Sequence, residues 1–470
     1  MGMTRAKHSG AGHGHPLVPA IFIALGLMAL MPALSRAGQA APAAPPKAHL
    51  AVLPFTGPAA GVPEGFGESL RQAVQYAVQM VRAVQLVDSG TILGAAQRVD
   101  VAPADRLSDE AMIRLGRELG VRGLISGTYE LGGETLKVQA RVADLGGKPQ
   151  VLAGEEVAGP LAEFLKGQER LARQTLQQLQ VKVTEQDARR LGTALAAQTA
   201  SVEAYTLYAQ AAWQQGLGTR EGHDRAIALL TKALEADRNF TLGRYALGIS
   251  LLATGNRWKA SGEIRKAIQI NENFAEAHRM LGDMMVMSPR RPYDQAIQAY
   301  QKAIELWPDY AEAFVGLGDA RAAKGQFDEA IQEYRRALAL EPENARVHFG
   351  MGKIYYNEKQ LYHEAVEEYQ RAIALDPKLL EAHLSLGEAY EEKGLYQEAI
   401  QRYSHALTIE PKHPMATYGL ALAYEKVDTK KAIETWEQYI DLASRLASEK
   451  EWLDIARRHL NRLQRGEKPN

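Results

Sequence analysis

The chain has 470 residues with 46% hydrophobic and 24% charged side chains, a composition that excludes wholesale disorder and a polytopic membrane protein. Its 55 basic and 56 acidic residues give a formal charge of −1, which argues against nucleic acid or an anionic membrane surface as the general partner. The absence of cysteine excludes disulfides, thiolate metal ligands and a cysteine nucleophile, and the length predicts about three domains.

Residues 1–37 predict a signal peptide or an N-terminal anchor. Arg5 and Lys7 precede an apolar stretch at 17–34 whose uninterrupted core is 12 residues long. That core fits the apolar region of a signal peptide, and Ser35-Arg36-Ala37 then places small residues at both ends of a cleavage site. A membrane span needs about 20 residues, and the whole stretch at 17–34 could just cross a bilayer, so retention as a single N-terminal anchor is the alternative. Both alternatives place the rest of the chain in the periplasm or cell envelope, with a membrane contact only through this segment.

Two short features complete the N-terminal region. Three histidines at positions 8, 13 and 15 lie among glycines in the leader, and we interpret them as unstructured sequence rather than as a metal-binding tract. Residues 38–47 are rich in alanine and proline and predict a short, stiff linker.

Residues 48–199 predict an N-terminal α/β domain, a mixed sheet with helices, that ends in a helical junction. The run 49–55 is almost continuously apolar, as in a strand buried on both faces. Residues 65–82 place their apolar side chains at helical spacing, whereas apolar and polar residues alternate along 136–142, as in a strand with one buried face. The other expected elements are strands at 84–87, 123–130 and 151–157, and helices at 108–119 and from 160 onward.

Local signals support these boundaries. Ser108 is a suitable N-cap for the helix that follows it, and Gly120 is a suitable stop. Two glycines at 132–133 predict the turn of a β-hairpin. Thr184 and Asp187 resemble a capping box that uses aspartate in place of the usual glutamate.

Three segments of this domain resemble the TolB amino-terminal-like domain, which also occurs in a flagellar-assembly outer-membrane family and ahead of repeat arrays in relatives of adenylate-cyclase regulators. The segments are LAVLPF at 50–55, RELGVRGLISGTY at 117–129 and the junction VTEQDARRLGTALAAQTASVEAYTLY at 183–208. The resemblance covers roughly residues 48–199 and implies a non-catalytic envelope domain. The chain has neither a cyclase domain nor a winged-helix segment, so nucleotide signalling and transcription are not implied.

The second half of the chain is repetitive. Similar segments of 34 to 39 residues begin at Val202, Thr241, Ala275, Ala311, Ala345, Leu380 and Pro414. The clearest, AEAFVGLGDARAAKGQFDEAIQEYRRALALEPEN at 311–344, resembles the tetratricopeptide (TPR) family, in which each repeat is a pair of helices. We therefore expect an all-α TPR solenoid of about seven repeats at 202–442, and a capping helix at 443–470 whose apolar stripe includes Trp452 and Leu463.

The repeat pattern has a physical explanation. A Leu-Gly type pair recurs in the first helix of each unit, as at Leu317-Gly318, although glycine inside a helix costs about 1 kcal/mol relative to alanine. Its recurrence therefore predicts that the second helix passes close to that glycine. Two inserted segments, at 216–224 in the first repeat and 287–293 in the third, are expected to be loops at the edge of the array.

Motifs that suggest chemistry are accounted for by the repeats. The segment His363-Glu364-Ala365-Val366-Glu367 resembles half of a zinc-protease motif, but the repeat register places it at the start of a second helix. Three histidines at one register, positions 278, 348 and 383, are spread along the array, too far apart for one metal. The sequence has no GxSxG, Walker A or strand-linked GxGxxG motif. We therefore expect no enzyme activity, no cofactor and no metal.

The expected binding site is a concave groove formed by the first helices. Residues five, nine and twelve of each repeat should face it. A mixture of aromatic anchors and scattered charges would suit an extended or helical peptide, although the groove could also be only a solvated trough. The predicted groove residues are Tyr245, Ile249, Leu252, Arg279, Asp283, Val315, Asp319, Phe349, Lys353, Tyr356, Leu384, Glu388, Tyr418 and Leu422, and the twelfth positions of the last two repeats add Glu391 and Glu425.

Two specialised TPR modes do not fit. The ninth residues include no asparagine for the Lys/Asn/Arg clamp of chaperone-tail binders, and the residues before the Leu-Gly pairs include none for the asparagine ladder of sugar transferases. We therefore expect an exported, non-catalytic scaffold that binds a protein or peptide in the groove. A self-assembling structural component, and a sensor acting through the α/β domain, are the alternatives.

Overall fold

A mixed sheet of six strands organises the N-terminal part of the chain. The computed structural model describes residues 47–58, 66–103, 105–132, 135–154, 156–196, 199 and 201–466, so the predicted leader lies outside the described residues. The sheet has the order β2-β1-β3-β4-β5, and β6 also pairs with β4. The strands are β1 (Ala48–Thr56), β2 (Val84–Leu86), β3 (Gly123–Gly132), β4 (Thr135–Asp144), β5 (Gln150–Ala153) and β6 (Val157–Pro160).

The sheet is mixed because β1 runs parallel to β2 and β3, whereas β3, β4, β5 and β6 pair antiparallel. The expected hairpin is confirmed in the ladder from Gly123↔Asp144 to Gly132↔Thr135. The residues of its turn, 133–134, lie outside the described part of the chain.

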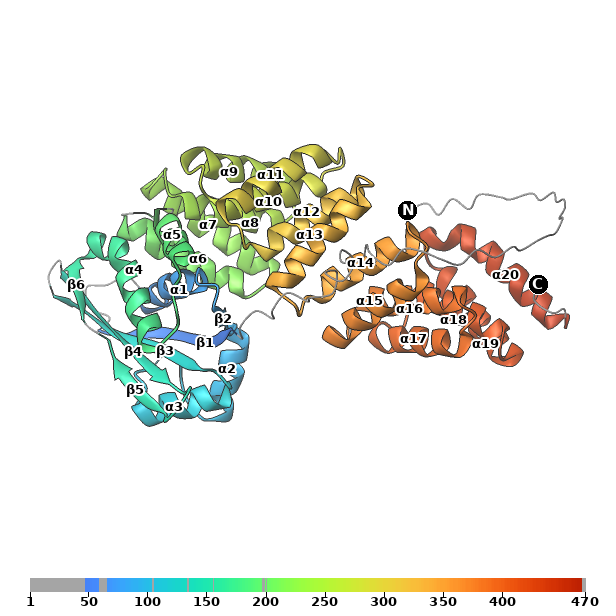
Figure 1. Ribbon diagram of the computed structural model, residues 1–470, viewed down its shortest axis with the longest axis horizontal. Coiled ribbons are helices and arrows are strands. Elements are labelled where there is room, and N and C mark those ends of the chain that lie inside the picture. The colour runs from blue at the N-terminus through green and yellow to red at the C-terminus, as the bar shows by residue number, and fades with distance from the viewer. Residues whose placement is uncertain are drawn as a thin grey trace, which may run out of the picture. The chain divides into compact units, whose positions relative to one another are not determined.

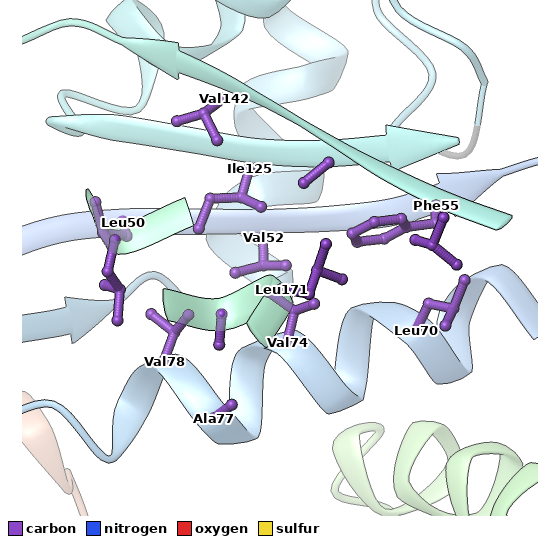
Figure 2. Close-up of a cluster of buried hydrophobic side chains, with 14 of the residues drawn as sticks. Leu50, Val52, Phe55, Leu70, Val74, Ala77, Val78, Ile125, Val142 and Leu171 are labelled. Carbon is purple, nitrogen blue, oxygen red and sulfur yellow. The ribbon is translucent and has the colours of Figure 1, made fainter. Parts of the chain in front are cut away.

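Helices cover both faces of this sheet. Leu50 and Val52 of β1 pack on one face against α1 (Phe66–Gln79) and α4 (Leu161–Gln178), as Figure 2 shows for Val74, Val78 and Leu171. Ala51 and Leu53 point the other way, into a core with α2 (Ser89–Arg98) and α3 (Asp109–Glu118). The alternation follows from the period of two in a strand, and it explains why β1 is apolar at nearly every position.

The signals at helix ends are largely confirmed. The Ser108 hydroxyl accepts a hydrogen bond from the Ala111 amide, and Gly120 has a φ of +64° just after α3. The Thr184 amide donates to Asp187 at 2.8 Å while the Asp187 amide donates to the Thr184 hydroxyl at 3.1 Å, which is the expected capping box of α5 (Glu185–Ala196). The helix α2, capped by Asp88, was not expected from the sequence.

The strand expected at 151–157 is divided in the structure. Residues of β5 pair with β4 from Asp144↔Gln150 to Arg141↔Ala153, whereas β6 pairs from Val138↔Val157 to Thr135↔Pro160. Between the two ladders the register shifts by one residue, so the prediction of one continuous strand is wrong. The physical reason is a β-bulge, in which an extra residue on one strand interrupts the ladder; here the interruption begins at Gly154.

Antiparallel helix pairs form the rest of the described chain (Figure 1). The first helices are α6 (Val202–Gly216), α8 (Thr241–Ala253), α10 (Ala275–Val286), α12 (Ala311–Ala323), α14 (Ala345–Asn357), α16 (Leu380–Glu392) and α18 (Pro414–Glu425). The second helices are α7 (Arg220–Ala236), α9 (Arg257–Ile270), α11 (Tyr293–Leu306), α13 (Phe327–Leu340), α15 (Tyr362–Leu375), α17 (Tyr396–Ile409) and α19 (Thr429–Ala443). A 3-10 turn (Ala447–Glu449) and α20 (Lys450–Gln464) follow.

The close helix contact predicted at the Leu-Gly pair is present. A Cβ added to Gly318 would lie 2.6 Å from Cε1 of Tyr334, whose buried ring fills the space between α12 and α13. The same relation holds between Gly352 and Tyr369, and between Gly387 and Tyr403. Glycine is therefore required at this register by packing against a tyrosine of the second helix.

One of the two expected loops is shorter than predicted. Residues 287–293 connect α10 to α11 as expected, but 220–224 form the first turn of α7 rather than part of a loop. The Thr219 hydroxyl caps that turn by accepting a hydrogen bond from the Gly222 amide, so the inserted residues mainly lengthen a helix. In the described part of the chain, no helix has the length and hydropathy needed to cross a membrane.

Candidate functional site

The first helices carry every predicted groove residue. We call the row formed by the fifth, ninth and twelfth residues of α8, α10, α12, α14, α16 and α18 the first-helix face. Along this row Val315, Leu384 and Glu425 are buried, Lys353 is exposed, and the other predicted residues are half-buried. The repeat register thus places these residues in one series of helices, but their burial differs along the array.

The N-terminal part of the first-helix face is covered by the α/β domain. Residues Ala44–Asn470 form one compact unit, in which α1 packs against the first repeats. Ala73 of α1 is 2% exposed and lies in a cluster with Tyr205 and Phe240, and Tyr76 packs against the same cluster beside Tyr245. The side of α1 that is turned away from the sheet therefore occupies this part of the array.

Tyr76 reaches four successive repeats. Its phenol lies among Tyr208 of α6, Tyr245 of α8, Glu276 of α10 and Tyr310 at the start of α12. Burial, followed by the nearby Glu276 carboxylate, holds the pKa of Tyr76 well above its ordinary value. Burial likewise raises the pKa of Tyr245 to about 12, against the opposing effect of Arg279. The hydroxyl groups of Tyr76 and Tyr245 therefore remain neutral at physiological pH, and both residues behave as core side chains.

Ion pairs at Asp309 fasten the same contact. Asp309 lies in the turn between α11 and α12, with its side chain 9% exposed, and it pairs with Arg190 of α5 and, at 3.7 Å, with Arg82 just beyond α1. The Arg190 guanidinium lies 4.9 Å from the centre of the Trp307 ring. Burial lowers the pKa of Arg190 to about 10, against the opposing effect of Asp187.

This covering of the array was missed by the sequence reasoning. The expected apolar face of α1 includes Leu70, Val74 and Val78, which pack on the sheet. Ala73 and Tyr76, three residues apart, form a second apolar strip on the same helix. Such a two-sided helix is the signal that could have indicated a second packing partner.

A recurring carboxylate is the main polar feature of the first-helix face. The Tyr300 hydroxyl donates to Asp283 at 2.6 Å, and the Tyr334 hydroxyl donates to Asp319 at 2.6 Å. In the later repeats the Tyr403 hydroxyl donates to Glu391 at 2.7 Å. In the last repeat Trp436 Nε1 donates to Glu425 at 2.8 Å. An aromatic donor from the second helix thus holds a carboxylate of the first helix in four of the repeats.

Three of these carboxylates also have a cationic partner. Arg279 pairs with Asp283 at 2.5 Å, and Arg346 pairs with Asp319. Glu425 accepts from Arg462 at 2.8 Å and lies 2.6 Å from Nδ1 of His459. The carboxylate of Glu425 therefore belongs to a contact within the chain, which joins α18 to α20, rather than to an open binding surface.

Glu391 is the exception. Among the described residues, no cationic side chain forms an ion pair with Glu388, Glu391 or Glu392 of α16. Burial, together with the neighbouring Glu388 and Glu392 carboxylates, raises the pKa of Glu391 to about 7, although the Tyr403 hydrogen bond opposes the change. Burial and then Glu392 also raise the pKa of Glu388. This part of the first-helix face holds acidic groups that none of the described side chains neutralises.

A cleft opens beside the middle of the first-helix face. It has a volume of about 580 Å³ between α12, α13 and α14, and its lining includes Asp319, Phe349 and Lys353. The Lys353 ammonium lies 5.7 Å from the centre of the Phe349 ring. Of the predicted groove residues, these three share a hollowed surface.

Aromatic rings continue the face toward the C-terminus. Tyr356 of α14 lies edge-on to Tyr362, and Tyr418 of α18 makes an edge contact with Trp452 of α20 at 5.5 Å. Trp452 is 42% exposed, so α20 extends the aromatic surface as well as capping the array. Aromatic side chains of this kind commonly anchor protein partners.

The histidines singled out from the sequence lie in separate local contacts. His348 lies 2.6 Å from Glu368, whereas His278 and His383 each contact a backbone carbonyl, of Glu272 and Pro377. His363 is exposed at the start of α15. No group of three or more potential metal-ligating side chains occurs among the residues described by the structure.

The comparisons with known proteins confirm the repeats. Tetratricopeptide-repeat models match residues 292–325, 318–359, 356–394 and 380–413. These residues lie within the array, so the TolB-like interpretation of 48–199 stays a prediction. No curated protein matches the chain.

Several solved structures are similar to part of the array. A crystal structure of MamA is 29% identical, over 35% of this chain and 95% of MamA, with a TM-score of 0.31. YrrB, described as a TPR protein with an unusual peptide-binding site, is 25% identical over 38% of this chain and 91% of YrrB, with a TM-score of 0.33. PilF of Pseudomonas aeruginosa is 21% identical over 45% of this chain and 91% of PilF, with a TM-score of 0.39.

Proposed function

We propose that this chain, whose array consists of tetratricopeptide repeats, is a non-catalytic scaffold that binds a protein or peptide partner through α14 and α16. The observation that carries the proposal is the unequal coverage of the first-helix face. Helix α1 covers the N-terminal part of the first-helix face through Ala73 and Tyr76. No element in the described part of the chain covers Lys353 and Tyr356 in this way. The partner would use the uncovered part.

The chemistry of the uncovered part suits a protein ligand. Phe349 and Tyr356 are half-buried aromatic side chains of α14, and each loses little conformational freedom when it is covered. The adjacent charges of Lys353 and Glu388 would fix the orientation of a bound segment. A reversible contact of this kind has a typical Kd near 1 μM, about −8 kcal/mol.

Export to the cell envelope is part of the same proposal. Its support is the basic and apolar leader at 1–37, followed by the linker at 38–47. Mass spectrometry of the mature N-terminus, together with fractionation of cells, tests it. We expect the chain in the envelope, and recovery only from the cytosol would contradict this part of the proposal.

The binding function is tested with the full-length chain as bait for solubilised envelope proteins. The variant Phe349→Ala/Tyr356→Ala alters the uncovered face, and Leu395→Ala/Tyr396→Ala alters a similar pair at the α16–α17 turn as a control. We expect a protein that the wild type and the control retain and the face variant loses. Retention of the same proteins by all three, or of none by the wild type, would contradict the proposal.

A further inference from the structure

A tryptophan is placed on the surface by a local reversal of the repeat pattern. The second helices α11, α13, α15 and α17 begin with an aromatic residue followed by a polar one: Tyr293-Asp294, Phe327-Asp328, Tyr362-His363 and Tyr396-Gln397. In α9 the order is reversed, Arg257-Trp258, although the buried alanine three residues after the helix start, Ala260, keeps its register. Trp258 therefore occupies a position that is polar in the other repeats, and it is 84% exposed.

An apolar cleft lies beside this tryptophan. It has a volume of about 360 Å³, and its lining includes Trp258, Leu281, Met284 and Met287. Met287, which is 44% exposed, begins the lengthened connection between α10 and α11, so the insertion in the third repeat helps to form the cleft. Methionine side chains are flexible and polarizable, and they adapt to different apolar ligands. The volume is at the small end for ligand sites, as suits one or two inserted side chains.

The charged residues in the lining all have one sign. Arg257 and Arg265 line the cleft, whereas no acidic side chain does so. The Arg257 guanidinium donates to the Met287 carbonyl at 3.4 Å, and Arg265 Nε donates to the Ser261 hydroxyl at 3.4 Å. Within the part of the chain that the structure describes, neither arginine forms an ion pair. Both guanidinium groups are exposed and can bind carboxylates of a partner.

From these features we propose a second docking site, which meets the first-helix face at Leu252 but lies away from α14 and α16, and which binds an acidic amphipathic segment of a partner protein. An apolar side chain of that segment enters the cleft against Trp258 and Met287. Acidic residues flanking it pair with Arg257 and Arg265. The charge complementarity selects an acidic ligand over a basic one, and the size of the cleft selects a side-chain anchor over a cofactor.

The chain offers variants that suit the fold. Trp258→Asp introduces the residue found at the equivalent positions of α11 and α13, Asp294 and Asp328, so the array should tolerate it. Arg257→Glu/Arg265→Glu reverses the charge while leaving the cleft floor intact. Trp213→Gln, at another exposed tryptophan, and Arg335→Glu, at the register of Arg265 in α13, serve as matched controls.

The test is selection of a random 12-residue displayed peptide library on the full-length chain, with Trp258→Asp for counter-selection. We expect enriched peptides to combine an aromatic, leucine or methionine anchor with a net negative charge. Synthetic copies should bind Trp258→Asp and the double charge reversal at least tenfold more weakly than the wild type, and the controls within about twofold. Circular dichroism tests whether each variant is folded. If Trp258→Asp is not folded, the double charge reversal is used for counter-selection instead.

The other outcomes overturn the proposal. Selection of no Trp258-dependent peptide would do so, as would enrichment of neutral or basic peptides, or binding that is unchanged by the charge reversal. Self-association that light scattering shows to depend on Trp258 would identify the site as an interface between two copies instead. None of these outcomes bears on the first-helix face, because Phe349→Ala/Tyr356→Ala tests that surface independently.

Discussion

Replacement of Glu391 by glutamine should stabilise the C-terminal repeats at alkaline pH. Glutamine keeps the size of the side chain and can still accept the hydrogen bond from Tyr403, but it removes a charge that no cation of the described chain neutralises. The titratable groups that face it are Tyr356 of α14, Glu388 and Glu392 of α16, and Tyr403 of α17. The tyrosines are neutral over the range considered, since burial raises the pKa of each.

The sign of the effect follows from linkage. Below pH 4.5 the carboxyl is protonated in both the folded and the unfolded chain, and Glu391 imposes no penalty. Between its ordinary pKa of 4.5 and the folded value of about 7, the unfolded chain ionises first, so the free energy of unfolding falls as the pH rises. The penalty is complete above pH 7. A shift of this size corresponds to about 3 kcal/mol, and partial exposure to solvent reduces it to about 2 kcal/mol.

Amide hydrogen exchange over α16 and α17 measures this effect locally, which is necessary because a repeat array does not unfold as one unit. We expect Glu391→Gln to slow exchange relative to the wild type at pH 8 and to leave it unchanged at pH 4. The control is Glu398→Gln, an exposed residue in the first turn of α17. Equal exchange of wild type and Glu391→Gln at pH 8, or faster exchange in the variant, would show that the Glu391 charge does not destabilise these repeats.

Three further predictions concern packing and docking. Gly318→Leu should overpack the Tyr334 ring and lower the stability of the array by about 1–3 kcal/mol, so an unchanged melting temperature would contradict the repeat register. Asp309→Ala should leave Arg190 without one of its two carboxylate partners and lower the stability of the α1–array contact by about 2–3 kcal/mol. The expected result is faster limited proteolysis of the junction at 180–200. Asp309→Asn also removes the charge but retains a hydrogen-bond acceptor, so its effect should be somewhat smaller; an Asn variant as stable as the wild type would argue against charge pairing.

Much of the fold follows from local sequence signals. The Thr184–Asp187 capping box and the Ser108 cap form as predicted because their hydrogen bonds join residues three apart and need no tertiary context. The Leu-Gly pattern also predicts its tertiary contact, since only a close neighbour explains a recurring glycine. The division of β5 from β6 is harder to predict, because a bulge depends on the partner strand.

The candidate site could be predicted only in part. Counting from the repeat starts assigns Tyr245, a fifth residue, and Tyr356, a twelfth residue, to the same row, yet Tyr245 is covered by Tyr76 of α1 and Tyr356 is not. The difference arises from a domain that is far away in the sequence. In the same way, the carboxylates Asp283 and Glu391 both accept a tyrosine hydrogen bond, but Arg279 pairs with the first and the chain supplies no described cation for the second.

The α/β domain covers the first repeats, and we propose that a partner binds the later ones, α14 and α16, which it leaves uncovered. Because the chain has no cysteine, Tyr245→Cys and Lys353→Cys each introduce a single thiol whose reaction with a bulky maleimide reports coverage. We expect labelling at least about tenfold slower at position 245 than at 353, and a selective increase at 245 when Ala73→Arg displaces α1. Equally fast labelling at both positions, or no response to Ala73→Arg, would contradict it.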